Sequence, residues 1–310
     1  MTGRCPAPAT VLLLGLLACR GAVSQDKPAP ASAPGPDSAD ILVFEKKLGG
    51  GKEDIYVIPA RGGAERRLSD DPGTDILPRF TPDGRSVVFS SDRSGRFQLW
   101  EVPADGGPAQ RIRSSGAEEW QADPSPDGGR IAFLSDIEGP VSLFILNRSN
   151  GAIRLLVRHG RRTDIGNPNW SPDGRRIVFS SNKGLGGHHV YVVDVATGQE
   201  QRASGFLAGA CEPRFSRDGR SVVFVDRSHI ARNRSRIVER DLASGTERGL
   251  VDWPALNYDP VFSPDGKEIA FASTVAGANA IYRLRLADGK SWRVTFGPGE
   301  ARHPDYAPRR

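Results

Sequence analysis

Five aspartates that recur at a nearly constant spacing are the first candidates for chemistry. They are Asp83, Asp127, Asp173, Asp218 and Asp265, and the spacings are 44, 46, 45 and 47 residues. Carboxylates could ligate a metal ion or act as general bases. Each aspartate, however, lies in a copy of Ser/Thr-Pro-Asp-Gly, with Arg217 in place of proline in one copy. Proline presets φ in a turn and glycine accepts positive φ, so we interpret these aspartates as turn residues.

Other residue types that catalyse reactions or bind metals form no recognisable pattern. The chain has no His-Glu-x-x-His and no Gly-x-Ser-x-Gly, and Gly289-Lys290-Ser291 lacks the preceding glycine of a phosphate-binding loop. His188 and His189 are adjacent, so they would face opposite sides of a strand. Cys211 suits a buried position among apolar residues. We expect no metal site and no cofactor.

The turns lie between short apolar segments that are typical of β-strands. Each turn follows a segment such as Pro168-Asn169-Trp170 and precedes one such as Ile177-Val178-Phe179. Two further strands follow in each unit, separated by a turn such as Thr197-Gly198. Four short strands in a unit of about 45 residues indicate the blade of a propeller.

The two ends of the repeat region each supply part of one blade. Residues 40–44, 54–58 and 65–68 predict a second, third and fourth strand, whereas residues 304–308 predict a lone first strand. Together they complete a blade. The sequence therefore predicts an all-β, six-bladed propeller of four-stranded blades over residues 40–310, closed by pairing of its N- and C-terminal strands.

The repeated pattern Pro-x-[Phe/Trp]-Ser-Pro-Asp-Gly-[Arg/Lys]-x-[Ile/Val]-x-Phe resembles that of TolB-like six-bladed propellers with WD-like repeats. The resemblance covers residues 40–308. It implies an exported bacterial protein that binds a partner at the cell envelope, as TolB binds a peptidoglycan-associated lipoprotein.

In a propeller, the loops that lead into the innermost strands line one mouth of the central channel. Here those loops are polar, which permits two interpretations. Their charged side chains pair with each other in a hydrated channel, or they form a site for a polar ligand or a peptide segment. The candidate binding residues are Asp75, Glu119, Trp120, Asp164, Glu212, Tyr258, Asp259, Arg302 and His303. A second ring of mostly polar residues follows the motif prolines: Arg79, Asp123, Asn169, Arg214, Val261 and Asp305.

Two functions remain open at this point. The first is a non-catalytic, monomeric scaffold that binds an envelope protein or peptide segment. The second is a hydrolase or lyase acting on a sugar or small polar substrate at the channel mouth, which would need an acid–base pair such as Glu119 with His303. The net charge of +5 comes from arginines dispersed along the chain, without interleaved aromatic residues, so we expect no binding to nucleic acid.

The N-terminal region predicts export. Residues 1–18 have a basic start and a short apolar stretch, as in a signal peptide, and residues 19–39 form a Pro/Ala/Ser-rich linker. The sequence Leu16-Leu17-Ala18-Cys19 resembles a lipoprotein box, which predicts acylation of Cys19 and a place in the periplasm or on the outer membrane. The alternative is ordinary cleavage nearby, with Cys19 incidental. We expect membrane contact only through this anchor.

The substitution Cys19→Ser tests the anchor. If Cys19 is acylated, the variant should move from the membrane fraction to the soluble fraction, because the buried acyl chains supply the membrane affinity. Mass spectrometry of the mature N-terminus measures the modification directly. An unmodified terminus downstream of Cys19 in the unsubstituted protein would show plain secretion instead.

Overall fold

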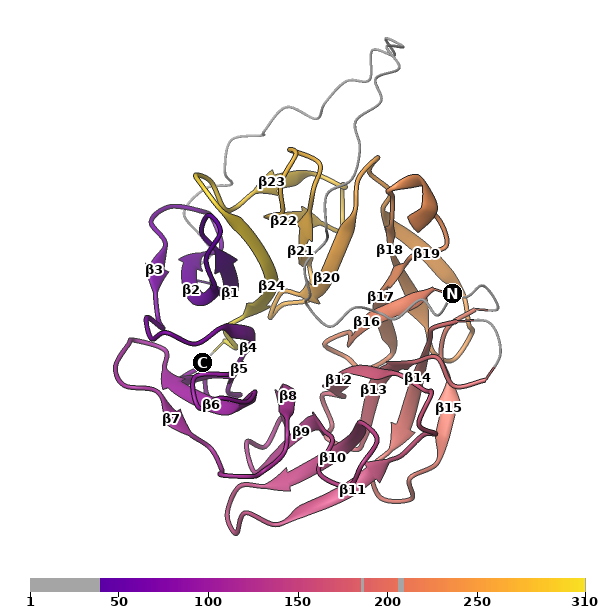
Figure 1. Cartoon of the computed structure of the whole chain (residues 1–310). Coiled ribbons are helices and arrows are strands. Elements are labelled where there is room, and N and C mark those ends of the chain that lie inside the picture. The colour runs from indigo at the N-terminus through magenta and orange to yellow at the C-terminus, as the bar shows by residue number, and fades with distance from the viewer. Residues whose placement is uncertain (1–39, 185–186, 206–208, 310) are drawn as a thin grey trace.

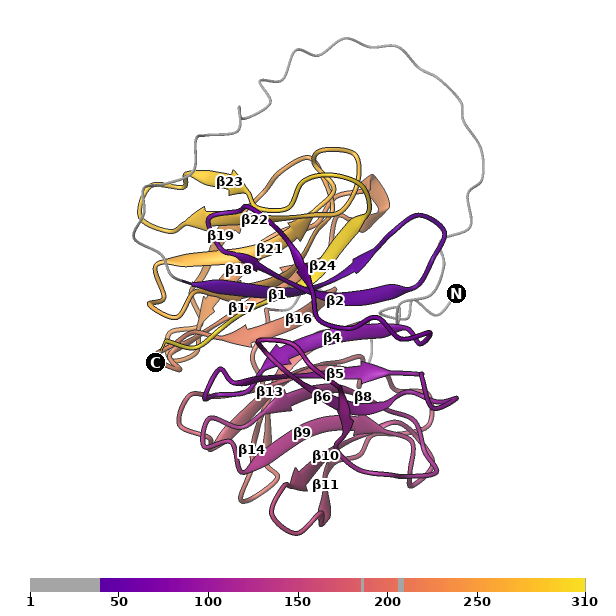
Figure 2. The same cartoon turned by 90° about the vertical axis from the view of Figure 1, so that its left-hand side faces the viewer.

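Six four-stranded antiparallel sheets form a ring around a central axis (Figure 1). The computed structural model describes residues 40–184, 187–205 and 209–309. The expected signal peptide (1–18), Cys19 and the linker (19–39) lie outside the described residues. The sheets stand side by side as blades, each with its first strand nearest the axis (Figures 1 and 2). The predicted six-bladed all-β propeller is confirmed.

We call the blade that joins the chain ends the closing blade and number the others first to fifth. The closing blade consists of β24 (Glu300–Tyr306), β1 (Ile41–Lys47), β2 (Glu53–Pro59) and β3 (Arg66–Arg67). The first and second blades consist of β4 (Asp75–Phe80), β5 (Ser86–Ser91), β6 (Gln98–Pro103), β7 (Gln110–Arg111), β8 (Glu119–Pro124), β9 (Arg130–Ser135), β10 (Ser142–Asn147) and β11 (Ile153–Val157). The third and fourth consist of β12 (Ile165–Trp170), β13 (Arg176–Ser181), β14 (His189–Asp194), β15 (Glu200–Arg202), β16 (Ala210–Phe215), β17 (Ser221–Asp226), β18 (Arg236–Asp241) and β19 (Glu247–Val251). The fifth consists of β20 (Asn257–Phe262), β21 (Glu268–Ser273), β22 (Ala280–Arg285) and β23 (Ser291–Arg293).

The repeated turns join the first and second strands of the five whole blades. In the third blade, the Ser171 hydroxyl and the Arg175 N–H both donate to Asp173 Oδ1, at 2.5 and 3.1 Å. The bond from Ser171 lowers the pKa of Asp173, and Gly174 has a φ of 66°. The same serine or threonine bond reaches Asp83, Asp127, Asp218 and Asp265. These aspartates are turn residues, as the sequence predicted.

The hydrophobic core lies between adjacent blades. The second strand of each blade contributes one buried phenylalanine. These are Phe44, Phe89, Phe133, Phe179, Phe224 and Phe271. One core cluster joins Ala132 and Leu134 of the second blade to Ile177 and Phe179 of the third. Each blade therefore depends on its neighbours for burial of its faces, which makes closure of the ring a condition for stability.

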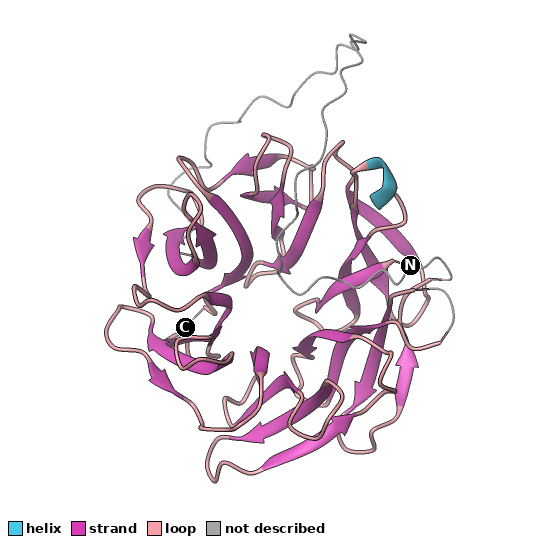
Figure 3. Cartoon of the chain, viewed as in Figure 1, coloured by secondary structure: helices cyan, strands magenta, loops and turns pink. Residues whose placement is uncertain are grey.

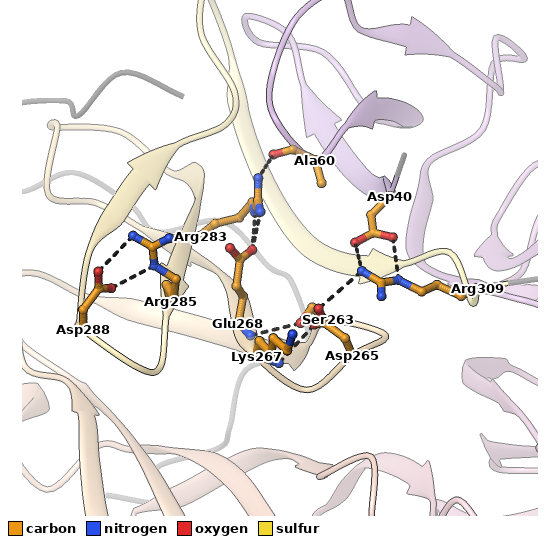
Figure 4. A network of polar contacts seen from close by, with 10 residues as sticks. All are labelled: Asp40, Ala60, Ser263, Asp265, Lys267, Glu268, Arg283, Arg285, Asp288 and Arg309. Atoms are coloured by element: carbon orange, nitrogen blue, oxygen red, sulfur yellow. Dashed lines mark hydrogen bonds and ion pairs between the residues drawn. The ribbon is translucent and has the colours of Figure 1, made fainter. Parts of the chain in front are cut away.

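The closing blade is fixed by strand pairing and by polar contacts. β24 pairs with β1 in an antiparallel register that places Leu42 opposite Tyr306. Arg283 of the fifth blade donates to the Ala60 carbonyl at 2.8 Å, and Arg309 bridges Asp40 and Asp265, both at 3.3 Å (Figure 4). These contacts join the two ends of the chain to the last whole blade.

Helical structure is nearly absent from the described part of the chain. Its single helix is the 3-10 turn η1 (Ile230–Arg232) before β18 (Figure 3). No helix within the described ranges is long and apolar enough to cross a membrane.

Deleting residues 300–310 tests the closure. The deletion removes β24 and exposes the edge of β1 together with the cores on both sides, so we expect loss of the cooperative unfolding transition, or insolubility. Deleting residues 309–310 is the matched control: it keeps β24 and removes the exposed Arg309 pairs, which should cost at most about 1 kcal/mol. Urea denaturation followed by circular dichroism measures both. Equal stability of the two deletions would contradict the closure.

Candidate functional site

The innermost strand of every blade carries a bulge with the same unusual backbone. The pairing register shifts at this point in all six blades. Each bulge holds a non-glycine residue with φ between 51° and 59°: Leu77, Gln121, Asn167, Glu212, Asp259 and His303. Such a conformation costs roughly 1–3 kcal/mol per residue and is concentrated at functional sites. The bulges therefore make the channel wall the candidate location of a functional site.

The bulges are held by hydrogen bonds from blade to blade. The N–H of Asn167 donates to Gln121 Oε1 at 2.6 Å, and that of Asp259 donates to Glu212 Oε2 at 2.8 Å. The N–H of His303 donates to Asp259 Oδ2 at 3.3 Å. Because the bulge removes these N–H groups from the strand ladder, the side chain of the preceding blade supplies the acceptor.

Five of the predicted binding residues come together where the fourth, fifth and closing blades meet. They form the mouth cluster with one further residue: Glu45, Glu212, Tyr258, Asp259, Arg302 and His303. His303 lies at its centre, with Nδ1 2.8 Å from Glu45 Oε1 and Nε2 3.2 Å from Asp259 Oδ1. Glu45 also accepts the Leu77 N–H at 2.8 Å, so the cluster reaches the first blade.

Two carboxylates of the mouth cluster lie beside basic side chains. Burial opposes the charge on Glu45, but His303, Arg302 and the Leu77 N–H together lower the pKa of its carboxyl group. Burial likewise opposes the charge on Asp259, whereas His303 and Arg302 lower its pKa. The Arg302 guanidinium lies 4.8 Å from the centre of the Tyr258 ring, and burial raises the pKa of Tyr258 to about 12. The cluster is thus a rigid set of paired charges with a neutral phenol beside it.

Two other predicted residues are buried away from this cluster. Asp75 and Glu119 have no exposed surface; they pair with Arg93 at 2.8 Å and Arg113 at 3.2 Å. Burial raises the pKa of both carboxyl groups. Glu119 and His303, the example of an acid–base pair that the enzymatic alternative would need, do not meet, because the His303 ring lies between Glu45 and Asp259.

Trp120 and Asp164 lie at other points near the starts of the innermost strands. Trp120 is half-buried and packs against the core between the second and third blades. Asp164 keeps 39% of its side chain exposed, and its Oδ2 lies 4.0 Å from His188 Nε2. Neither residue belongs to the mouth cluster.

Glu45 was missed by sequence reasoning, which ended the predicted strand at Phe44. Strand β1 continues to Lys47 and places Glu45 opposite Arg302. The available signal was an acidic residue directly after four apolar ones, a pattern that is unusual in a strand buried on both faces. The bulge residues give a second signal, since five of them directly precede a proline.

The carboxylates of Glu45 and Asp259 are engaged by neighbouring groups. Each accepts a hydrogen bond from a backbone N–H and lies within 3.2 Å of a nitrogen of the His303 ring. Within the described ranges, no group of three or more His, Cys, Asp or Glu residues is disposed to hold a metal ion.

Comparison with known families agrees with the repeat and the ring. A family model described as the TolB beta propeller domain matches three overlapping stretches, residues 11–187, 122–250 and 161–310. The chain belongs to the TolB β-propeller family.

Relatives in this family and beyond it share different portions of the chain. The Tol-Pal system protein TolB of Bordetella pertussis is 52% identical over 128 residues, which cover 41% of this chain and 28% of that protein. The chain thus matches less than a third of that relative's length. The crystal structure of TolB from Acinetobacter baumannii has a TM-score of 0.77 at 18% identity, over 88% of this chain and 68% of that one. An oligogalacturonate lyase in complex with manganese has a TM-score of 0.57 at 14% identity, over 82% and 73%, and shows the fold alone.

The substitution Glu45→Gln tests the electrostatics of the mouth cluster of this TolB-family propeller. At pH 7 it should destabilise the protein by roughly 1–3 kcal/mol, because His303 loses one of its charged partners. The pKa of the Glu45 carboxyl group is lower in the folded protein than in the unfolded chain, where it is about 4.3. The ionised carboxylate therefore stabilises the fold above about pH 4.3, and this stability is lost as the pH falls through the pKa of the folded state. The difference between wild type and variant should therefore shrink below about pH 4.

Urea denaturation at several pH values measures this effect. Glu138→Gln is the control, since Glu138 pairs with Arg158 at an exposed site and 48% of its side chain is accessible. Its effect should be small at every pH. A Glu45→Gln effect that does not change with pH would contradict the paired-charge description.

Proposed function

We propose that this propeller is a non-catalytic binding module of the bacterial cell envelope, which binds a protein segment at the mouth of its channel. The observation that carries the proposal is the mouth cluster itself. Its carboxylate groups lie beside Arg302 and the His303 ring, and half-buried aromatic and arginine side chains lie at the same position of neighbouring innermost strands.

Tyr258, Arg302 and Trp120 each directly precede the bulge residue of their strand, and each is partly exposed. Tyrosine, tryptophan and arginine are the residue types that most often dominate the energy of protein interfaces. The second and fifth blades, which carry Trp120 and Tyr258, stand opposite each other in the ring (Figure 1). A peptide segment or loop that covers the mouth could contact both.

Family membership supports a protein partner. Because the TolB relatives carry the name of the Tol-Pal system, we propose a partner of that kind, such as a peptidoglycan-associated lipoprotein. The proposal includes export through residues 1–18, a monomeric propeller, and a lipid anchor at Cys19 that places it in the periplasm or on the outer membrane. The linker at 19–39 would connect the anchor to Ile41.

The enzymatic alternative lacks a comparable observation. A sugar hydrolase or lyase needs a carboxyl group or base that can exchange a proton with the substrate. In the mouth cluster these groups lie against each other, and Glu119 and His303, the example of a suitable acid–base pair, have separate partners.

Binding measurements with the purified full-length chain and the peptidoglycan-associated lipoprotein of the same organism test the proposal. Tyr258→Ala and Trp120→Ala should each weaken binding by about tenfold or more, because each removes a large aromatic contact. Ile41→Ala is the matched control, since Ile41 is 44% exposed at the start of β1, at the end of the closing blade opposite the mouth. Circular dichroism verifies folding. Equal affinity of all three variants, or no binding by the wild type, would reject this partner at this mouth.

A further inference from the structure

A cavity of about 260 Å³ opens at the other end of the channel, among the repeated turns. All six blades contribute to it, so it lies around the axis. Its wall contains the second ring predicted from sequence, Arg79, Asp123, Asn169, Arg214, Val261 and Asp305. Pro82, Pro126, Pro172 and Pro308 form an apolar rim, and Arg217 lies where the fourth turn lacks its proline.

Three polar residues of this ring have a structural task. Asp123 Oδ2 accepts the N–H of Trp170 at 2.8 Å, Asn169 Oδ1 accepts that of Phe215 at 2.9 Å, and Asp305 Oδ2 accepts that of Phe80 at 2.9 Å. Each bond joins one blade to the next, in the same way as the bonds at the bulges. These hydrogen bonds account for the polar side chains at these three positions, and no ligand is needed to explain them.

Hydrogen bonds to the next blade do not account for the two arginines of the ring. Arginine cannot accept a hydrogen bond, and the second-blade residue that corresponds to Phe80 is Pro124, which has no N–H to offer. Val261 occupies the same position in the fifth blade, which shows that an apolar side chain suffices there. Yet Arg79 and Arg214 are only 8% and 9% exposed, and burial of a charged group is costly unless a counter-charge compensates it.

Their shared counter-charge is weak. Both face Asp123 Oδ1, with Arg214 Nη1 at 3.3 Å and Arg79 Nε at 3.9 Å. Burial raises the pKa of Asp123 to about 7, so this carboxyl group is partly protonated at neutral pH. Asp305, the other acid of the ring, interacts with Arg79 and Arg217, but burial raises its pKa as well. With Arg217 at the rim, the cavity has an excess of positive charge.

We propose that this cavity binds a small organic acid, whose carboxylate lies between Arg79 and Arg214. A guanidinium presents paired N–H donors that match the two oxygens of a carboxylate. The volume lies just below the usual range for drug-sized ligands, which favours a compact acid of a few carbons. The site is separate from the mouth cluster and does not depend on the function proposed there.

The proposal predicts that affinity depends on the charge of Asp123. This side chain faces Arg79 of β4, Arg214 of β16, Asn169 of β12 and Asp305 of β24. When Asp123 is protonated, the two guanidinium groups lose their internal carboxylate and are free for a ligand carboxylate. Binding of a fully ionised acid should therefore tighten as the pH falls through about 7.

Calorimetric titration of the full-length chain with tartrate, at constant ionic strength, tests the site. Tartrate stays fully ionised between about pH 6 and pH 8, so its own charge does not change. Arg214→Gln should weaken binding roughly tenfold or more. Asp123→Asn should tighten it and remove its pH dependence, because asparagine keeps the acceptor for Trp170 but carries no charge. Arg220→Gln, on the same end with 84% of its side chain exposed, should change nothing.

Sulfate serves as a second probe, because it has the same charge but a tetrahedral shape. Weaker binding of sulfate than of tartrate is expected, since the smaller sulfate ion fills less of the cavity and contacts fewer of its side chains than a four-carbon acid does. Absence of tartrate binding would overturn the proposal, as would equal affinity in the Arg214, Asp123 and Arg220 variants. Sulfate binding as tightly as tartrate would overturn the assignment to carboxylates.

Discussion

The hydrogen bonds that cross from blade to blade at the innermost strands are the interactions on which the rest of this structure depends. Each bulge places a non-glycine residue at positive φ and takes its N–H out of the strand ladder. A side chain of the preceding blade, such as Gln121 for Asn167 or Glu212 for Asp259, supplies the missing acceptor. No single blade can satisfy its own innermost strand. The strained backbone is therefore stable only in the complete ring, in which the closing blade contributes Glu45 and His303.

Hydrogen bonds between neighbouring blades hold both ends of the channel, but the charged side chains at the two ends are paired differently. At the mouth, His303 lies between Glu45 and Asp259, and Arg302 lies beside Asp259, so both carboxylates have a basic neighbour. At the turn end, Arg79 and Arg214 share the single carboxyl group of Asp123, whose charge is suppressed by burial. Carboxylates with basic neighbours beside partly exposed aromatic residues suit a protein surface, whereas two buried arginines that share one carboxyl group suit a small anion.

Sequence patterns predicted the fold well because the signals that set it are local. The Ser/Thr-Pro-Asp-Gly copies fix their own turns through bonds between residues two apart, as Ser171 and Asp173 show. The alternation of apolar residues then decides which strands are buried. The site was predicted less well. Asp75 and Glu119 are as acidic as Asp259, but arginines on nearby loops or strands bury and pair them, and such pairing leaves no trace in residue spacing.

By itself the sequence determined the repeat, the turns, the number of blades and the shared closing blade, since each follows from neighbouring residues and a constant period. It also placed Arg79, Asp123 and Arg214 at one equivalent position of different blades. Only the tertiary structure decided which side chains of different blades meet. The contact of Glu45 with His303 joins residues from the two ends of the chain, and the N–H groups of the bulges bond to side chains of the preceding blade. Both depend on distances across the ring, which no local pattern encodes.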